Sequence, residues 1–178
     1  QFDINGNITA NGGVIDITNN GEGGLTVDGT INEGLLASYP DIADDEGLTM
    51  VNNAGVFDIN GEIIANGGII SITNNGTELN IDGTIKQQGA KTFDEKSLKE
   101  INTAGDTTIT NNNGNLNITG TINSNNVKNN TTIINNGDAL NVATTGNINT
   151  SGNLNIQNYG AGGLNIDGNI TNNNSAFT

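Results

Sequence analysis

The sequence contains no cysteine, histidine or tryptophan, its five basic residues are all lysine, and it has one proline and 3% aromatic residues. The absence of cysteine excludes disulfides and thiol chemistry. Without histidine as well, the usual ligands of zinc and the commonest general base are missing. These absences weigh against a metalloenzyme or a hydrolase with a catalytic histidine.

Positive charge is also scarce, since the formal net charge is −14. Binding to a phosphate backbone needs a basic stripe that displaces counterions, so nucleic acid is excluded as a partner. No apolar run is long enough to span a membrane, and the N-terminus lacks the basic and apolar regions of a signal peptide. We expect no membrane insertion of this segment, and either a cytoplasmic chain or a signal outside it.

Glycine, asparagine and a recurring motif, [Leu/Phe]-x-[Ile/Val]-x-Gly-x-Ile, are abundant instead. The motif starts at Phe2, Leu25, Phe57, Leu79, Leu116, Leu140 and Leu164, and the copy at Leu140 has two extra residues before its glycine. A second motif, such as Ile72-Thr73-Asn74-Asn75, precedes the later copies. Most starts are about 23 residues apart, which predicts one β-solenoid segment, residues 1–178, with about seven coils.

The positions within the motif predict its conformation. Leu79, Ile81, Gly83 and Ile85 alternate with polar residues, which indicates an extended strand with one apolar face. The glycine marks a corner, by a bend or a close backbone approach, and the Asn-Asn-Gly clusters mark a second corner. Each coil should therefore hold about three short strands. The predicted fold class is all-β, a parallel β-helix.

Stacked coils would place equivalent apolar residues in inward columns and outward asparagines in side-chain ladders. Seven coils would form a rod of roughly 34 Å. No cap is evident at either end of this rod. Because exposed strand edges need protection, we expect a segment of something longer or a chain that stacks end to end.

The first interruption of the repeat runs over about residues 32–48 and contains the only proline. An acidic group there offers oxygen ligands for Ca²⁺, although its spacing matches no known calcium loop and a solvated acidic loop also explains it. Its residues are Asp41, Asp44, Asp45 and Glu46. No other cofactor is predicted. Candidate partner contacts in this insertion are Leu35, Leu36 and Tyr39.

The second interruption runs over about residues 86–106. Thr92 and Glu95 fit a capping box, which predicts a short helix with Phe93, Leu98 and Ile101 on one face. These three residues either cover the flank of the rod or contact a partner.

Paired carboxylates are the one catalytic arrangement left open. Asp28, Asp82 and Asp167 recur at one motif position, but Thr119 replaces them in another copy. A turn residue explains this distribution better than an active site, and the chain is predicted not to be an enzyme. Among several N-x-[Ser/Thr] sequons, Asn7, Asn117 and Asn169 are candidate glycosylation sites.

Stretches such as Gly146–Ile156 and Gly163–Ile170 resemble the repeats of filamentous-haemagglutinin-like exoproteins, including the high-molecular-weight adhesins. The resemblance covers the coils and leaves out both insertions. It implies a right-handed parallel β-helix, export by two-partner secretion to the cell surface, and a role in attachment, aggregation and biofilm formation. It also implies a surface protein or glycan of a host or neighbouring cell as partner, or further copies of the chain.

The predicted function is therefore an extracellular structural or adhesive repeat segment of a bacterial surface adhesin. Two alternatives stay open. One is a phage or virus tail-fibre segment, in which three intertwined chains fill the apolar columns. The other is a subunit of an extracellular filament that stacks end to end.

Overall fold

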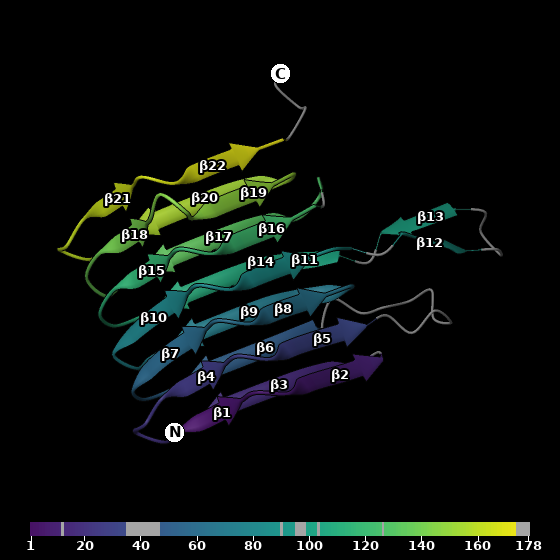
Figure 1. Cartoon of the computed structure of the whole chain (residues 1–178). Coiled ribbons are helices and arrows are strands. Elements are labelled where there is room, and N and C mark those ends of the chain that lie inside the picture. Colours follow the sequence, from purple (N-terminus) through teal and green to yellow (C-terminus); the bar gives the residue numbers. More distant parts are fainter. Residues whose placement is uncertain are drawn as a thin grey trace.

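The computed structural model describes residues 1–11, 13–34, 47–89, 91–94, 99–102, 104–125 and 127–173. Every regular element within these residues is a β-strand, and the chain winds into a right-handed parallel β-helix of seven coils (Figure 1). Each complete coil gives one strand to each of three parallel sheets, named A, B and C. The predicted fold class is confirmed.

Each sheet stacks its strands in chain order, from the first coil to the last. Sheet A contains β1 (Phe2–Ile4), β4 (Leu25–Val27), β7 (Val56–Ile59), β10 (Glu78–Ile81), β15 (Leu116–Ile118), β18 (Leu140–Val142) and β21 (Leu164–Ile166). Sheet B contains β2 (Asn7–Asn11), β5 (Thr30–Gly34), β8 (Glu62–Ala65), β11 (Thr84–Gln87), β16 (Thr121–Ser124), β19 (Asn147–Thr150) and β22 (Asn169–Asn172). Sheet C contains β3 (Val14–Asn19), β6 (Gly47–Asn52), β9 (Gly68–Asn74), β14 (Ala104–Asn111), β17 (Asn130–Asn135) and β20 (Asn153–Asn158).

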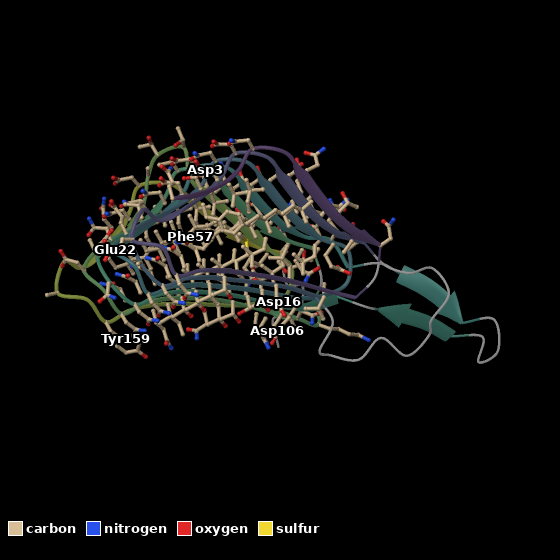
Figure 2. All side chains as sticks on the ribbon, turned by 90° about the horizontal axis from the view of Figure 1, so that it is seen from below. Asp3, Asp16, Glu22, Phe57, Asp106 and Tyr159 are labelled. Carbon is tan, nitrogen blue, oxygen red and sulfur yellow. The ribbon has the colours of Figure 1, made fainter. Side chains whose placement is uncertain are left out.

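The core consists of columns of apolar side chains that run along the axis of the coils. In β10, Leu79 and Ile81 are fully buried. The register places Leu79 between Phe57 of the preceding coil and Leu116 of the following one. Figure 2, a view along the axis, shows Phe57 inside the ring of sheets. Burial of each such side chain contributes about 1.5–3 kcal/mol, so these columns provide the main stabilisation.

The corner between sheets A and B requires glycine because successive coils approach closely there. A Cβ atom on Gly83 would lie 2.0 Å from the carbonyl oxygen of Gly61. The amides of Asp82 and Gly83 both donate to the carbonyl of Ile59, at 2.9 and 2.8 Å, which draws the two backbones together. The predicted corner at the motif glycine is confirmed, and its physical cause is lack of space for a side chain.

The two extra residues of the sixth coil are absorbed at this same corner. A turn closes where the amide of Gly146 donates to the carbonyl of Ala143 at 2.7 Å. Beyond the turn, Ile148 is fully buried and pairs in register with Ile122 and Ile170. The insertion therefore leaves the inward column intact.

The corner between sheets C and A contains a buried ladder of asparagine side chains. Its rungs are Asn19, Asn52, Asn74, Asn111, Asn135 and Asn158, and the Nδ2 of each of the first five donates to the Oδ1 in the next coil at 2.7–2.9 Å. Asn74 also accepts from the amide of Gly76 at 3.1 Å. A buried polar group without a partner costs about 1–3 kcal/mol of stability. The hydrogen bonds between these asparagines avoid this cost.

A second ladder lies beside the first, on the outside of the turns. Its hydrogen bonds run the other way, because Asn75 donates to Asn53 of the preceding coil at 2.8 Å and Asn112 donates to Asn75 at 2.7 Å. The predicted outward ladder is confirmed. The buried ladder goes beyond the prediction from the sequence, in which the Asn-Asn pairs indicate only turns.

Candidate functional site

The second insertion forms a hairpin, and the predicted short helix is wrong. Strand β12 (Lys91–Asp94) pairs antiparallel with β13 (Lys99–Asn102). The inserted chain leaves β11 and returns to β14, so its two limbs start side by side, an arrangement that favours antiparallel pairing. An isolated helix of this length is marginal in water. Figures 1 and 2 show the hairpin projecting away from the coils.

Of the candidate contacts in this insertion, Phe93 lies in β12 opposite Glu100, and Ile101 lies in β13 opposite Thr92. Leu98 lies outside the described residues. The hairpin therefore presents two of the three candidates on its strands, at a site remote from the core.

Residues 35–46 of the first insertion lie outside the described part of the chain. The candidate contacts Leu35, Leu36 and Tyr39 and the candidate calcium ligands Asp41, Asp44, Asp45 and Glu46 fall within this range and stay predictions. In the described residues, no group of three or more His, Cys, Asp or Glu side chains is arranged to hold a metal ion.

The three candidate sequons have different surroundings. Asn117 donates to Glu78 and Asn80 at 2.8 and 2.9 Å and accepts from Asn141 at 2.9 Å, so a glycan on its amide would disrupt a ladder on sheet A. Asn169 is exposed and donates to Asn147 at 3.1 Å. Asn7 is exposed at the start of β2 and makes no side-chain hydrogen bond to the described residues. Asn7 is therefore the most accessible of the three.

The recurring carboxylates at the corner between sheets A and B alternate with hydrogen-bond donors. Asn60 donates to Asp28 at 2.8 Å, and Thr119 donates to Asp82. Asp28 and Asp82 thus lie two coils apart, with Asn60 between them. In this arrangement the carboxylates accept hydrogen bonds from adjacent coils and help to hold the coils in register.

The corner between sheets B and C buries hydroxyl groups without pairing them. The side-chain oxygens of Thr107, Ser124, Thr131 and Thr150 are buried and have no hydrogen-bond partner among the described residues. Thr107 stacks on Thr131, and Ser124 stacks on Thr150, in adjacent coils. The buried hydroxyls at this corner were not predicted from the sequence, although the alternation within the strands places these four side chains on the inward face.

The outward side of sheet C carries a second set of hydroxyls that the sequence analysis did not single out. Four central strands, β6, β9, β14 and β17, present two aligned columns there. These columns consist of Thr49, Ser71, Thr108 and Thr132, and of Val51, Thr73, Thr110 and Ile134. None of these side chains makes a hydrogen bond within the described residues, in contrast to the ladders on sheet A.

Comparison with known proteins found no similar protein. No protein-family model matches the chain, and neither the curated proteins nor the solved structures contain a match. In the part of the chain that the structure describes, no helix is long and apolar enough to cross a membrane.

Proposed function

We propose that this chain is an extracellular structural and adhesive repeat segment of a bacterial surface adhesin. It would act as a stiff stalk and contact surface in attachment, aggregation or biofilm formation. Its partner would be a protein or glycan on a host or neighbouring cell, or further copies of itself. The proposal rests on the β-helix fold together with the resemblance of the repeats to two-partner-secretion exoproteins.

The observation that carries the proposal is the continuity of the sheets across both insertions. Strand β5 pairs with β8 on either side of the first insertion, and β11 pairs with β16 on either side of the second. The hydrogen-bonded ladders also continue past these points, since Asn74 donates to Asn111 at 2.8 Å. A rod that stays continuous while it extrudes loops is suited to hold contact segments away from a surface.

A test is to display the chain on a bacterial strain that lacks its own adhesins and to measure attachment, autoaggregation and biofilm mass. The matched control is a displayed variant in which a Gly-Ser turn replaces residues 91–102. We expect the full chain to increase at least one of the three readouts, and the variant to lose the part that depends on the hairpin. Equal attachment, autoaggregation and biofilm mass for the strain with and without the displayed chain would contradict the proposal.

Exposed apolar side chains favour end-to-end stacking as a second candidate. Leu164, Ile166 and Ile170 of the last coil are 49%, 42% and 37% exposed, whereas their neighbours in the preceding coil are fully buried. A further coil would bury them, and in a filament another copy would supply it. Electron micrographs at rising concentration test this candidate, because filaments should lengthen, whereas rods of constant length would contradict it.

The intertwined trimer has less support. It requires three chains to fill the apolar columns, but here one chain supplies the strands of all three sheets in each of the first six coils. A stable trimer of the isolated chain, measured by its molar mass, would reverse this preference.

A further inference from the structure

Asparagine followed directly by glycine recurs at the turns of the rod, and this pair is chemically labile. Asparagine is among the thermally labile residues. When glycine follows it, no side chain hinders attack of the glycine nitrogen on the carbonyl carbon of the asparagine side chain. The sequence has eight Asn-Gly pairs, and the structure describes both residues of seven, whose asparagines are Asn5, Asn20, Asn60, Asn66, Asn75, Asn113 and Asn136.

In five of these seven pairs, the glycine amide, which is the attacking group, donates a hydrogen bond. Gly21, Gly76 and Gly137 donate to the asparagine of the buried ladder two residues before them, at 3.1, 3.1 and 3.4 Å. Gly61 and Gly67 donate to the preceding coil at 2.8 and 3.3 Å. In these five turns the attacking nitrogen is held away from the asparagine side chain that it would have to reach.

Asn113 and Gly114 form an exception inside the rod. They lie at the corner between sheets C and A, in the turn between β14 and β15. The amide of Gly114 makes no hydrogen bond to the described residues, whereas the equivalent amides of Thr77 and Asp138 donate to the preceding coil at 2.7 and 2.6 Å. Gly114 adopts a left-handed conformation (φ 62°), as does Gly55 at the same place in the second coil (φ 69°), and neither amide donates to the preceding coil.

The next coil offers a matched pair at the same corner. Asn113 and Asn136 are both exposed, and the glycine after each is half-buried. The amide of Gly137 is hydrogen-bonded, and the Asn136 side chain donates to Asn112 at 2.9 Å. The Asn113 side chain donates to the carbonyl of Asn75 at 2.8 Å, but the nitrogen that would attack it has no partner within the described residues. The two pairs therefore differ chiefly in the hydrogen bond of the attacking amide.

We propose that Asn113 is a site of spontaneous deamidation in the folded rod. The Gly114 nitrogen loses its proton to hydroxide and forms a bond to Cγ of Asn113. The bond between Cγ and Nδ2 then breaks, and the nitrogen takes up a proton and leaves as ammonia. Water opens the resulting five-membered imide at one carbonyl to give aspartate, or at the other to give isoaspartate. Water is the only co-reactant.

Either product changes the corner between sheets C and A. Aspartate at position 113 cannot donate to the carbonyl of Asn75, and isoaspartate lengthens the backbone just before Gly114. This stretch is crowded, since a Cβ atom on Gly114 would lie 1.7 Å from the carbonyl oxygen of Thr77. Deamidation therefore weakens the contact between adjacent coils as the rod ages. This inference goes beyond the proposed adhesive function, and either one can fail without the other.

The test is tryptic mapping by mass spectrometry after the folded chain has been incubated at mildly alkaline pH. Cleavage after Lys99 and Lys128 separates the two matched pairs into residues 100–128 and 129–178, and neither peptide contains another Asn-Gly pair. We expect deamidation of the first peptide to be about ten times faster or more, because the second must first break the hydrogen bond of its glycine amide. Fragmentation should locate the change at residue 113, and isoaspartyl methyltransferase should label this peptide. A sample without incubation corrects for reaction during digestion.

The same chain incubated in urea is the reference, because the two pairs should react at similar rates once the hydrogen bonds are lost. Asn113→Ala gives this turn the same dipeptide as Ala54-Gly55 in the second coil and should abolish the reaction in residues 100–128 alone. Circular dichroism verifies that the variant folds, and Asn113→Gln replaces it if it does not.

The proposal is overturned if the two peptides of the folded chain react at equal rates, or if Asn113 reacts only in urea. Asn5 gives a further comparison, since it is exposed in the first coil and neither its side chain nor the Gly6 amide makes a hydrogen bond to the described residues. Reaction at Asn5 without reaction at Asn113 would also overturn the proposal, because a free glycine amide would then not be sufficient inside the rod.

Discussion

The corner between sheets C and A and the corner between sheets B and C both bury polar side chains, but only the first links equivalent side chains from coil to coil. At the second, Gln87 donates to the carbonyl of Gly68 at 2.7 Å and Glu33 accepts from the amide of Gly67 at 3.3 Å. At the first corner, asparagine recurs in six coils and each amide bonds to the next. At the second corner, the inward column of sheet B changes from coil to coil. Its residues are Ala10, Glu33, Ala65, Gln87, Ser124 and Thr150.

The two corners differ because a ladder requires the same residue at the same register in successive coils. Both insertions leave the rod at the corner between sheets B and C, after β5 and after β11. Varied residues at this corner form no ladder that an inserted loop would interrupt. The corner between sheets C and A therefore holds the coils together, and the corner between sheets B and C accommodates the insertions.

The largest predicted effect comes from breaking the buried ladder. Asn74→Leu removes the hydrogen bonds of Asn74 to Asn52 and Asn111 and leaves buried polar groups without partners. We expect the free energy of unfolding to fall by about 3 kcal/mol or more, as measured with a denaturant. Asn75→Leu, the control on the outer ladder, should cost about 1 kcal/mol or less. Equal losses for the two variants would contradict the distinction between the ladders.

Removal of an unpaired buried hydroxyl should stabilise the chain instead. Thr131→Val keeps the shape of the side chain and removes a buried oxygen that has no partner among the described residues. We expect the free energy of unfolding to rise by about 1 kcal/mol. The outward neighbour Thr132→Val should change it by less than about 0.5 kcal/mol. A clear loss of stability in Thr131→Val would indicate that an ordered water satisfies this hydroxyl.

The tolerance of the corner between sheets B and C can be measured with the hairpin. Replacement of residues 91–102 by a short turn should change the free energy of unfolding by less than about 1 kcal/mol, because loop-closure entropy depends weakly on length. Insertion of the same hairpin between Asn75 and Gly76, where both ladders pass, should lower the free energy of unfolding by about 2 kcal/mol, because it disturbs hydrogen bonds in both ladders. Comparable stability of the two variants would refute the idea that the corners differ in tolerance.

The smallest effect is expected for the ionic contact between coils on sheet B. Lys86 and Glu62 are each 34% exposed, so water and salt screen their attraction. Lys86→Met should lower the free energy of unfolding by about 0.5 kcal/mol at low ionic strength. Repeating the measurement in high salt should remove most of this difference, and an undiminished difference would show that packing of the lysine stem causes it.

Much of the fold could be predicted because alternation and a fixed period both act locally along the chain. The columns that contain Leu79 and Ile81, the corner at Gly83 and the positions of both insertions follow from these two patterns. The hairpin was missed because the capping box of Thr92 describes a local preference, whereas the side-by-side return of the chain to β14 is set by the stacked coils.

The surfaces were harder to predict. The position of Asn74, two residues after the inward Ile72, already places its side chain inside, but only the neighbouring coils reveal that Asn52 and Asn111 satisfy it. In the same way, the sequence places Thr108 and Thr110 on one outward face. Whether their hydroxyls form hydrogen bonds depends on contacts between coils, which cannot be predicted from the sequence alone.

The spacing of the buried asparagines also has a consequence for the rate of folding. Asn52 and Asn74 are 22 residues apart, whereas Asn74 and Asn111 are 37 apart because the hairpin lies between them. Closing the longer loop costs about 0.5 kcal/mol more, which would slow the addition of that coil about twofold. Each finished coil is a template for its successor, so the chain can fold from one end to the other with brief pauses where loops intervene.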